Sequence, residues 1–89
     1  MTSKLESGQD LNALKVELIR ANLETAIAFA KLSLQSDNEK EIHRYRQKAC
    51  DLYEEALHCL RTATLTHIEF ESIRTKLEHL EPILIAELS

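Results

Sequence analysis

The sequence predicts an all-α fold, an antiparallel up-down-up three-helix bundle with long helices. Three observations lead to this prediction. The 89 residues include one glycine, Gly8, and one proline, Pro82, so residues that interrupt helices are nearly absent. The strong helix formers Leu, Ala, Glu, Lys, Arg and Gln fill most of the chain. Apolar residues recur every three or four positions in three long segments, which two short polar breaks separate.

The first helix is expected to begin at Asp10, whose carboxylate can accept hydrogen bonds from the first free backbone amides. Residues 1–9 are then a disordered polar tail, and residues 10–89 form a single domain. This helix carries two apolar stripes. The first stripe contains Leu11, Leu14, Leu18, Ala21, Thr25, Ala28 and Leu32, and the second contains Val16, Ile19, Leu23, Ile27, Ala30 and Leu34. Two stripes are wider than one neighbouring helix can cover, so this helix is expected to contact two partners.

Two capping boxes predict where the other helices begin. In such a box a Ser or Thr hydroxyl accepts from the amide three residues later, and the acidic side chain there accepts from the first residue's amide. Ser36 and Glu39 can form the first box, which predicts a second helix from there to about Ala63. Thr66 and Glu69 can form the second box, which predicts a short turn before a third helix.

The later helices are each expected to bury one apolar face. In the second helix this face contains Ile42, Tyr45, Ala49, Leu52, Tyr53, Ala56, Leu57 and Leu60. In the third helix it contains Ile68 or Phe70, and then Ile73, Leu77, Leu80 and Leu84. Pro82 removes one helical hydrogen bond and its ring clashes with the preceding turn, so we expect the third helix to be kinked or broken near Pro82.

Charge and hydropathy exclude several classes of partner. The net charge is −4, and no segment forms the basic face that phosphate backbones require, so we expect no nucleic-acid partner. No apolar run approaches the ~18–20 residues needed to span a bilayer, so we expect no membrane partner. The first ten residues lack the apolar segment of a secretory signal, which predicts a cytoplasmic protein.

The two cysteines do not indicate a reactive site. Cys50 and Cys59 lie in the same predicted helix, roughly 13 Å apart along its axis, so they cannot pair without unwinding it. Two thiols that cannot pair indicate a reducing compartment. The cysteines and the four histidines show none of the spacings of zinc ligands, and we expect no metal and no cofactor. Nucleophilic catalysis needs loops that orient a base and an oxyanion site, and this chain has few, so we expect no enzyme.

A cluster of basic residues lies early in the second helix. Lys40, Arg44 and Lys48 are four residues apart and share one helix face. Glu41 is close enough in sequence to pair with Arg44, which favours a solvated face stabilised by pairs within the helix. The alternative is a contact patch for an acidic partner.

The segment from Ala49 to Leu57 resembles part of two known families. Its sequence is ACDLYEEAL, with small residues at Ala49 and Ala56 and larger ones at Tyr53 and Leu57. It is similar to the second helix of a tetratricopeptide repeat (TPR) and to the central helix of microtubule-interacting-and-trafficking (MIT) domains. In both families an Ala-x3-Tyr-x2-Ala-Leu strip packs one helix against another. No second copy follows at a period near 34 residues, so we expect no repeat array. The resemblance implies a groove between helices that binds a short peptide helix or strand.

The sequence therefore predicts a non-enzymatic helical interaction module, which either self-associates, for example as a homodimer, or docks a partner helix or peptide. We expect the contact to be made by Ile19, Leu23, Ile27, Ile83, Ile85 and Leu88. One alternative is a small redox-responsive regulatory protein that uses Cys59, the cysteine nearer the edge of the apolar face. Another is a purely structural domain of a larger assembly.

Overall fold

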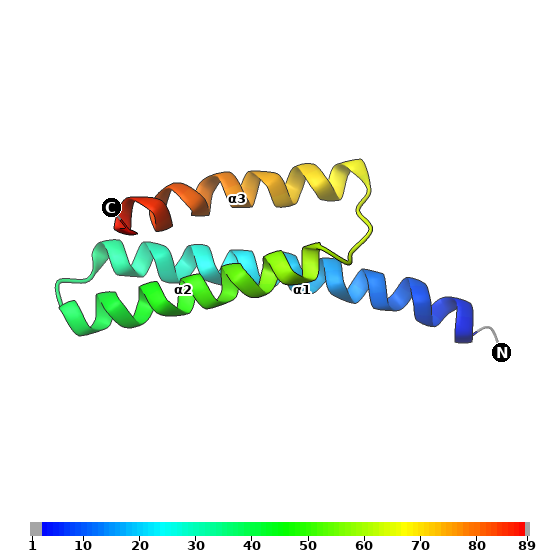
Figure 1. The fold of residues 1–89 in the computed structure, drawn as a ribbon, viewed down its shortest axis with the longest axis horizontal. Coiled ribbons are helices and arrows are strands. Elements are labelled where there is room, and N and C mark those ends of the chain that lie inside the picture. Colours follow the sequence, from blue (N-terminus) through cyan, green and yellow to red (C-terminus); the bar gives the residue numbers. More distant parts are fainter. Residues whose placement is uncertain (1–2, 89) are drawn as a thin grey trace.

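The protein is a slender bundle of three helices (Figure 1). The computed structural model describes the backbone of residues 3–88 and the side chains of residues 11–85. The helices are α1 (Ser3–Gln35), α2 (Glu39–Leu60) and α3 (His67–Leu88), and this described range contains no strand. The three run up, down and up along a molecule of 55 × 23 × 17 Å. The predicted all-α bundle is confirmed.

α1 is the helix on which the other two pack. Its contact with α2 is the most extensive, its contact with α3 is smaller, and α2 and α3 touch each other least. Small residues allow the close approach of α1 and α2, because Ala26 and Ala30 on α1 and Ala49 and Ala56 on α2 are all buried. The rest of the buried cluster consists of Ile19, Leu23, Ile73, Leu80 and Leu84.

The two apolar stripes of α1 differ in burial. Most of the second stripe is buried or half-buried, and only Leu34 is exposed. Asn22, beside this stripe, is also buried. All seven positions of the first stripe are exposed. α1 does contact two helices, as predicted, but both lie against the same broad side. The first stripe is therefore left uncovered among the described residues.

One of the three helix starts agrees with its prediction from the sequence, and the other two differ. Thr66 and Glu69 form the predicted capping box, with the Glu69 amide donating to Thr66 Oγ1 at 3.1 Å and the Thr66 amide to Glu69 Oε1 at 2.9 Å. The N-cap of α2 is Asn38 rather than Ser36, because Asn38 Oδ1 accepts from the amides of Lys40 and Glu41. Ser36 Oγ instead accepts from the Asn38 amide at 3.2 Å.

α1 begins at Ser3, so the N-cap predicted at Asp10 lies inside the helix. The residues before Asp10 include good helix formers, and one internal glycine, Gly8, costs a helix only about 1 kcal/mol. At the other end of the bundle α2 stops at Leu60, three residues before the predicted Ala63.

A polar clamp fixes the connection between α2 and α3 to α1. Asn12 Nδ2 donates to the Thr64 carbonyl at 2.8 Å, and the Thr64 amide donates to Asn12 Oδ1 at 2.7 Å. This reciprocal pair holds the connection beside the first part of α1, where the chain turns back and α3 starts along the bundle (Figure 1).

α3 is one helix from His67 to Leu88 with Pro82 inside it, so it is not broken there, and the predicted kink stays a prediction. Leu84 is buried and Ile83 packs on the core. These contacts hold the turn after Pro82 in place and offset the missing hydrogen bond. At the start of α3 the structure differs from the prediction that Ile68 or Phe70 is buried. Both side chains are exposed, so this prediction is wrong.

Because one stripe of α1 is buried and the other is exposed, the same substitution should change the free energy of unfolding by different amounts in the two stripes. Leu23→Ala should lower the free energy of unfolding by about 2–5 kcal/mol, because it opens a cavity in the core. Leu14→Ala, the same substitution on the exposed stripe, should change it by less than about 0.5 kcal/mol in dilute solution. Urea unfolding followed by circular dichroism measures both. Equal losses for the two variants would contradict the orientation of α1.

Candidate functional site

The exposed stripe of α1 is an apolar feature that follows the helix along the described surface. Its leucines are largely accessible, with Leu11 59%, Leu14 65%, Leu18 45% and Leu32 41% exposed. Between them lie Ala21, Thr25 and Ala28, which are also exposed. From Leu11 to Leu32 the stripe is roughly 32 Å long at 1.5 Å per residue. We call these seven residues the α1 stripe.

Each side of the α1 stripe is bordered by contacts to another helix. On one side Glu24 Oε2 lies 3.9 Å from Lys76 Nζ of α3. On the other side the Phe29 ring stacks on Tyr45 of α2, with ring centroids 6.0 Å apart. The stripe therefore has a flank near α3, which carries Glu17, Glu24 and Lys31. Its flank near α2 carries Lys15, Asn22 and Phe29.

Asn22, on the flank near α2, holds a buried polar atom that lacks a partner. Its side chain is 9% exposed, and Nδ2 has no hydrogen-bond partner among the described residues. An unsatisfied buried donor costs about 1–3 kcal/mol. The stripe thus borders a polar group whose hydrogen-bonding capacity is unused within the described bundle.

The predicted contact residues do not form one surface. Ile19 and Leu23 are 0% exposed and belong to the core, where a partner cannot reach them. Ile27 and Ile83 are half-buried and pack against that core. Ile85 is 63% exposed, and the side chain of Leu88 lies outside the described residues. The prediction failed for Ile19 and Leu23 because it assigned the wrong stripe of α1 to the surface.

A second apolar surface follows the groove between α2 and α3. Near the connection a hollow of about 410 Å³ is lined by Leu60, Leu65, Phe70, Ile73, Arg74 and Leu77. Near the other end one of about 310 Å³ is lined by Cys50, Tyr53, Glu54, Glu81, Leu84 and Ile85. The groove exists because α2 and α3 both pack on α1 and hardly on each other.

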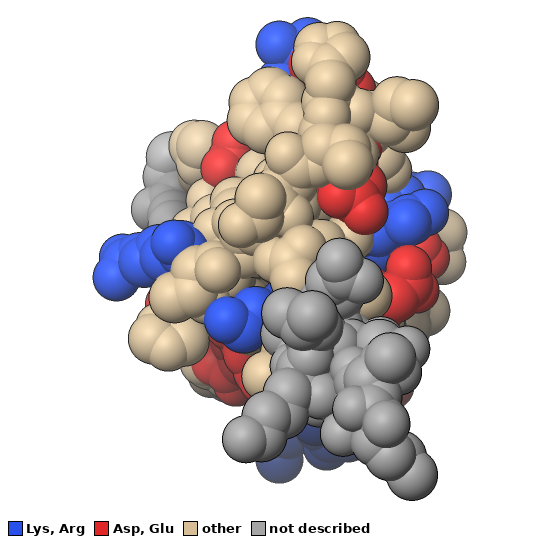
Figure 2. All heavy atoms as spheres, turned by 90° about the vertical axis from the view of Figure 1, so that its right-hand side faces the viewer, with Lys and Arg blue, Asp and Glu red and all other residues tan. Residues whose placement is uncertain are grey.

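Exposed apolar side chains also gather where α3 begins. Figure 2 views the molecule from that end, and most of its upper surface is uncharged, with Lys, Arg, Asp and Glu around it. Ile68 and Phe70 contribute to the exposed apolar area in this part of the chain. This area is separate in sequence from the α1 stripe, which makes Ile68 a useful control position.

One hydrogen bond joins α2 directly to α3 across the groove. Tyr53 Oη donates to Glu81 Oε2 at 2.6 Å. Burial, this hydrogen bond and the negative charge of Glu81 together raise the pKa of Tyr53 from 10.0 to about 12. The neutral phenol is therefore favoured in the folded state, which is the form that can donate to the carboxylate.

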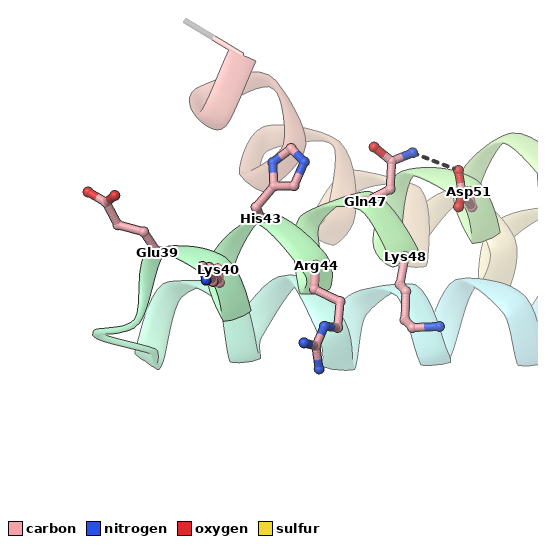
Figure 3. A pocket seen from close by; sticks show the side chains of 7 residues that line it. All are labelled: Glu39, Lys40, His43, Arg44, Gln47, Lys48 and Asp51. Atoms are coloured by element: carbon pink, nitrogen blue, oxygen red, sulfur yellow. Dashed lines mark hydrogen bonds between the residues drawn. The ribbon is translucent and has the colours of Figure 1, made fainter.

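The polar face of α2 forms a wide, open hollow (Figure 3). It is lined by Glu39, Lys40, His43, Arg44, Gln47, Lys48 and Asp51, all from this one helix. Their side chains spread away from one another, and Gln47 Nε2 donates to Asp51 Oδ1 at 3.0 Å. The carboxylates Glu39 and Asp51 lie at the two ends of this lining and the cations lie between them, with no wall from a second element. This arrangement fits a solvated helix face.

The chemistry-bearing side chains do not assemble into a site. Cys50 and Cys59 are half-buried and are not joined to each other by a disulfide. Within the described part of the chain, no three His, Cys, Asp or Glu side chains come close enough to hold a metal ion. The same described residues include no helix with the length and apolar character needed to cross a membrane.

Comparisons with known proteins add no assignment, because no family model, no curated protein and no solved structure matches this chain. The likeness of residues 49–57 to TPR and MIT helices therefore stays a prediction. Ala49 and Ala56 are buried against α1, and Tyr53 and Leu57 are half-buried. The predicted packing role of this strip is confirmed, whereas a shared ancestry with either family is untested.

The Tyr53–Glu81 contact predicts a pH dependence. The pKa of Tyr53 is higher in the folded state, so its contribution to stability is fully present below pH 10 and is lost as the pH rises through about 12. Ultraviolet titration of phenolate in a Tyr45→Phe background should give a folded midpoint near 12. Glu81→Gln should lower this midpoint part of the way towards 10.0, because the burial of Tyr53 remains. A midpoint near 10.0 in both proteins would show that the contact does not form.

Proposed function

We propose that the protein is a non-enzymatic helical interaction module that self-associates or docks a partner helix through the α1 stripe. The observation that carries this proposal is the exposure of all seven stripe positions on a helix whose opposite side is the core. A cytoplasmic location belongs to the same proposal, because two thiols that do not pair suit a reducing compartment.

The α1 stripe is suited to a helix rather than to a small molecule. Its residues recur at alternating spacings of three and four, which is the pattern that fits one helix along another. Fully burying one leucine side chain contributes about 1.5–3 kcal/mol, and four leucines stand exposed along this line. Covering them with a second helix would therefore give a substantial driving force for association.

The contact residues proposed here differ from those expected from the sequence. The α1 stripe replaces Ile19, Leu23 and Ile27. Ile85 stays a candidate, because it is exposed and lines one hollow of the groove between α2 and α3. That groove is divided between two hollows, and the α1 stripe is continuous, so the stripe is the better surface for a long helix.

Site-specific photo-crosslinking in native extract tests the proposal. Benzoylphenylalanine in place of Leu18 should give a covalent adduct, either with a second copy or with another protein. The same residue in place of Ile68, which is 80% exposed at the start of α3, is the matched control and should give little adduct. Circular dichroism should show that both variants fold.

A second substitution makes this test sharper. Adding Leu32→Glu to the position-18 probe should cut the adduct yield about tenfold, because a charge on the stripe must be desolvated when a helix covers it. The proposal is wrong if position 18 gives no more adduct than position 68. It is also wrong if Leu32→Glu leaves the yield unchanged while the protein stays folded.

A further inference from the structure

We propose that the α1 stripe binds the α1 stripe of a second copy of this chain, with the two helices antiparallel. This inference rests on the proposed function and names its partner. A two-fold axis would pass between Ala21 and Thr25. About that point the spacings of three and four between stripe residues are the same in both directions, so the stripe is complementary to its own reverse.

The antiparallel register gives each layer a suitable pair of side chains. Leu14 packs beside Leu32 of the second copy, Leu18 beside Ala28, and Ala21 beside Thr25. The large residues therefore lie towards the ends and the small residues at the centre. Small residues at a crossing point let two helix backbones approach closely, as Ala26 and Ala49 already do within the monomer.

Charges on the flank near α3 complement each other in this register. Glu17 lies opposite Lys31 of the second copy, and symmetry forms the pair twice. Glu24 lies near the axis, opposite its own counterpart. The Lys76 ammonium, 3.9 Å from Glu24, offsets that like-charge contact in each copy.

The flank near α2 adds no polar contact to this register. Asn22 lies at the level of the axis, but its Nδ2 is buried inside the monomer, where a second copy cannot reach it. The register therefore rests on the spacing of the stripe and on the charges of the flank near α3.

The other arrangements lose these advantages. A parallel pair sets Glu17 opposite Asn22 and Glu24 opposite Phe29, so these described residues form no oppositely charged pair. Sliding the antiparallel pair by one heptad in one direction sets Glu17 opposite Glu24. Sliding it in the other direction sets Glu24 opposite Lys31, but it leaves Leu11 and Leu14 beyond the end of the second α1, which stops at Gln35.

Variants with reversed charges at positions 17 and 31 test the register. Sedimentation equilibrium from about 10 μM to about 1 mM measures the dimerisation of each variant. The unmodified protein should show a monomer–dimer equilibrium in this range. Glu17→Lys and Lys31→Glu should each weaken dimerisation at least about tenfold, because each sets like charges opposite each other twice. The double variant, E17K with K31E, should restore it.

Mixing the two single variants gives a matched control in the same experiment. One then carries two lysines and the other two glutamates, so both cross-pairs are attractive and a heterodimer should form. Arg74→Glu, at an exposed cation of α3 away from the stripe, should leave dimerisation unchanged. The monomer fold is checked by circular dichroism in each case.

A chain that stays monomeric up to about 1 mM overturns this inference. The proposed function would still stand if position 18 crosslinks a different protein. A dimer that tolerates both single exchanges, or that the double variant does not rescue, overturns the antiparallel register.

Discussion

The close packing of α2 on one side of α1 is the contact on which the rest of the structure depends. Buried alanines on both helices, Ala26 and Ala30 on α1 and Ala49 and Ala56 on α2, let the two backbones approach closely, and α3 packs beside α2 on the same broad face of α1. Because both helices lie against that one face, the opposite face of α1 is left uncovered among the described residues. The exposed α1 stripe is thus a direct consequence of how the core is built.

This arrangement separates, along one helix, the residues that form the core from those proposed to bind a partner. Ile19 and Leu23 are buried in the core, whereas Leu14 and Leu18, a few residues away on α1, are exposed. A second helix could cover the stripe without repacking the core, so association would need little rearrangement of the bundle. The groove between α2 and α3 has a different character, because Tyr53 and Glu81 bridge it.

Some local features of the structure were predictable from the sequence, whereas its long-range contacts were not. The capping box of Thr66 and Glu69 spans four residues and depends on local geometry alone. The burial of Ala49 and Ala56 follows from helical periodicity. The choice between the two stripes of α1 does not, since both are apolar and only the placement of α2 and α3 decides which is covered. The Asn12–Thr64 clamp joins residues 52 positions apart, and no local signal marks it.

The central claim is that α1 has a buried core side and an exposed docking side. Methyl NMR with a soluble paramagnetic probe tests this most directly, at increasing protein concentration. At low concentration the methyl signals of Leu14, Leu18 and Leu32 should be strongly broadened, and those of Ile19 and Leu23 should not. As the concentration rises, the stripe methyls should become protected while the core methyls stay unchanged. Protection of the stripe at every concentration, or broadening of Leu23, would contradict the account.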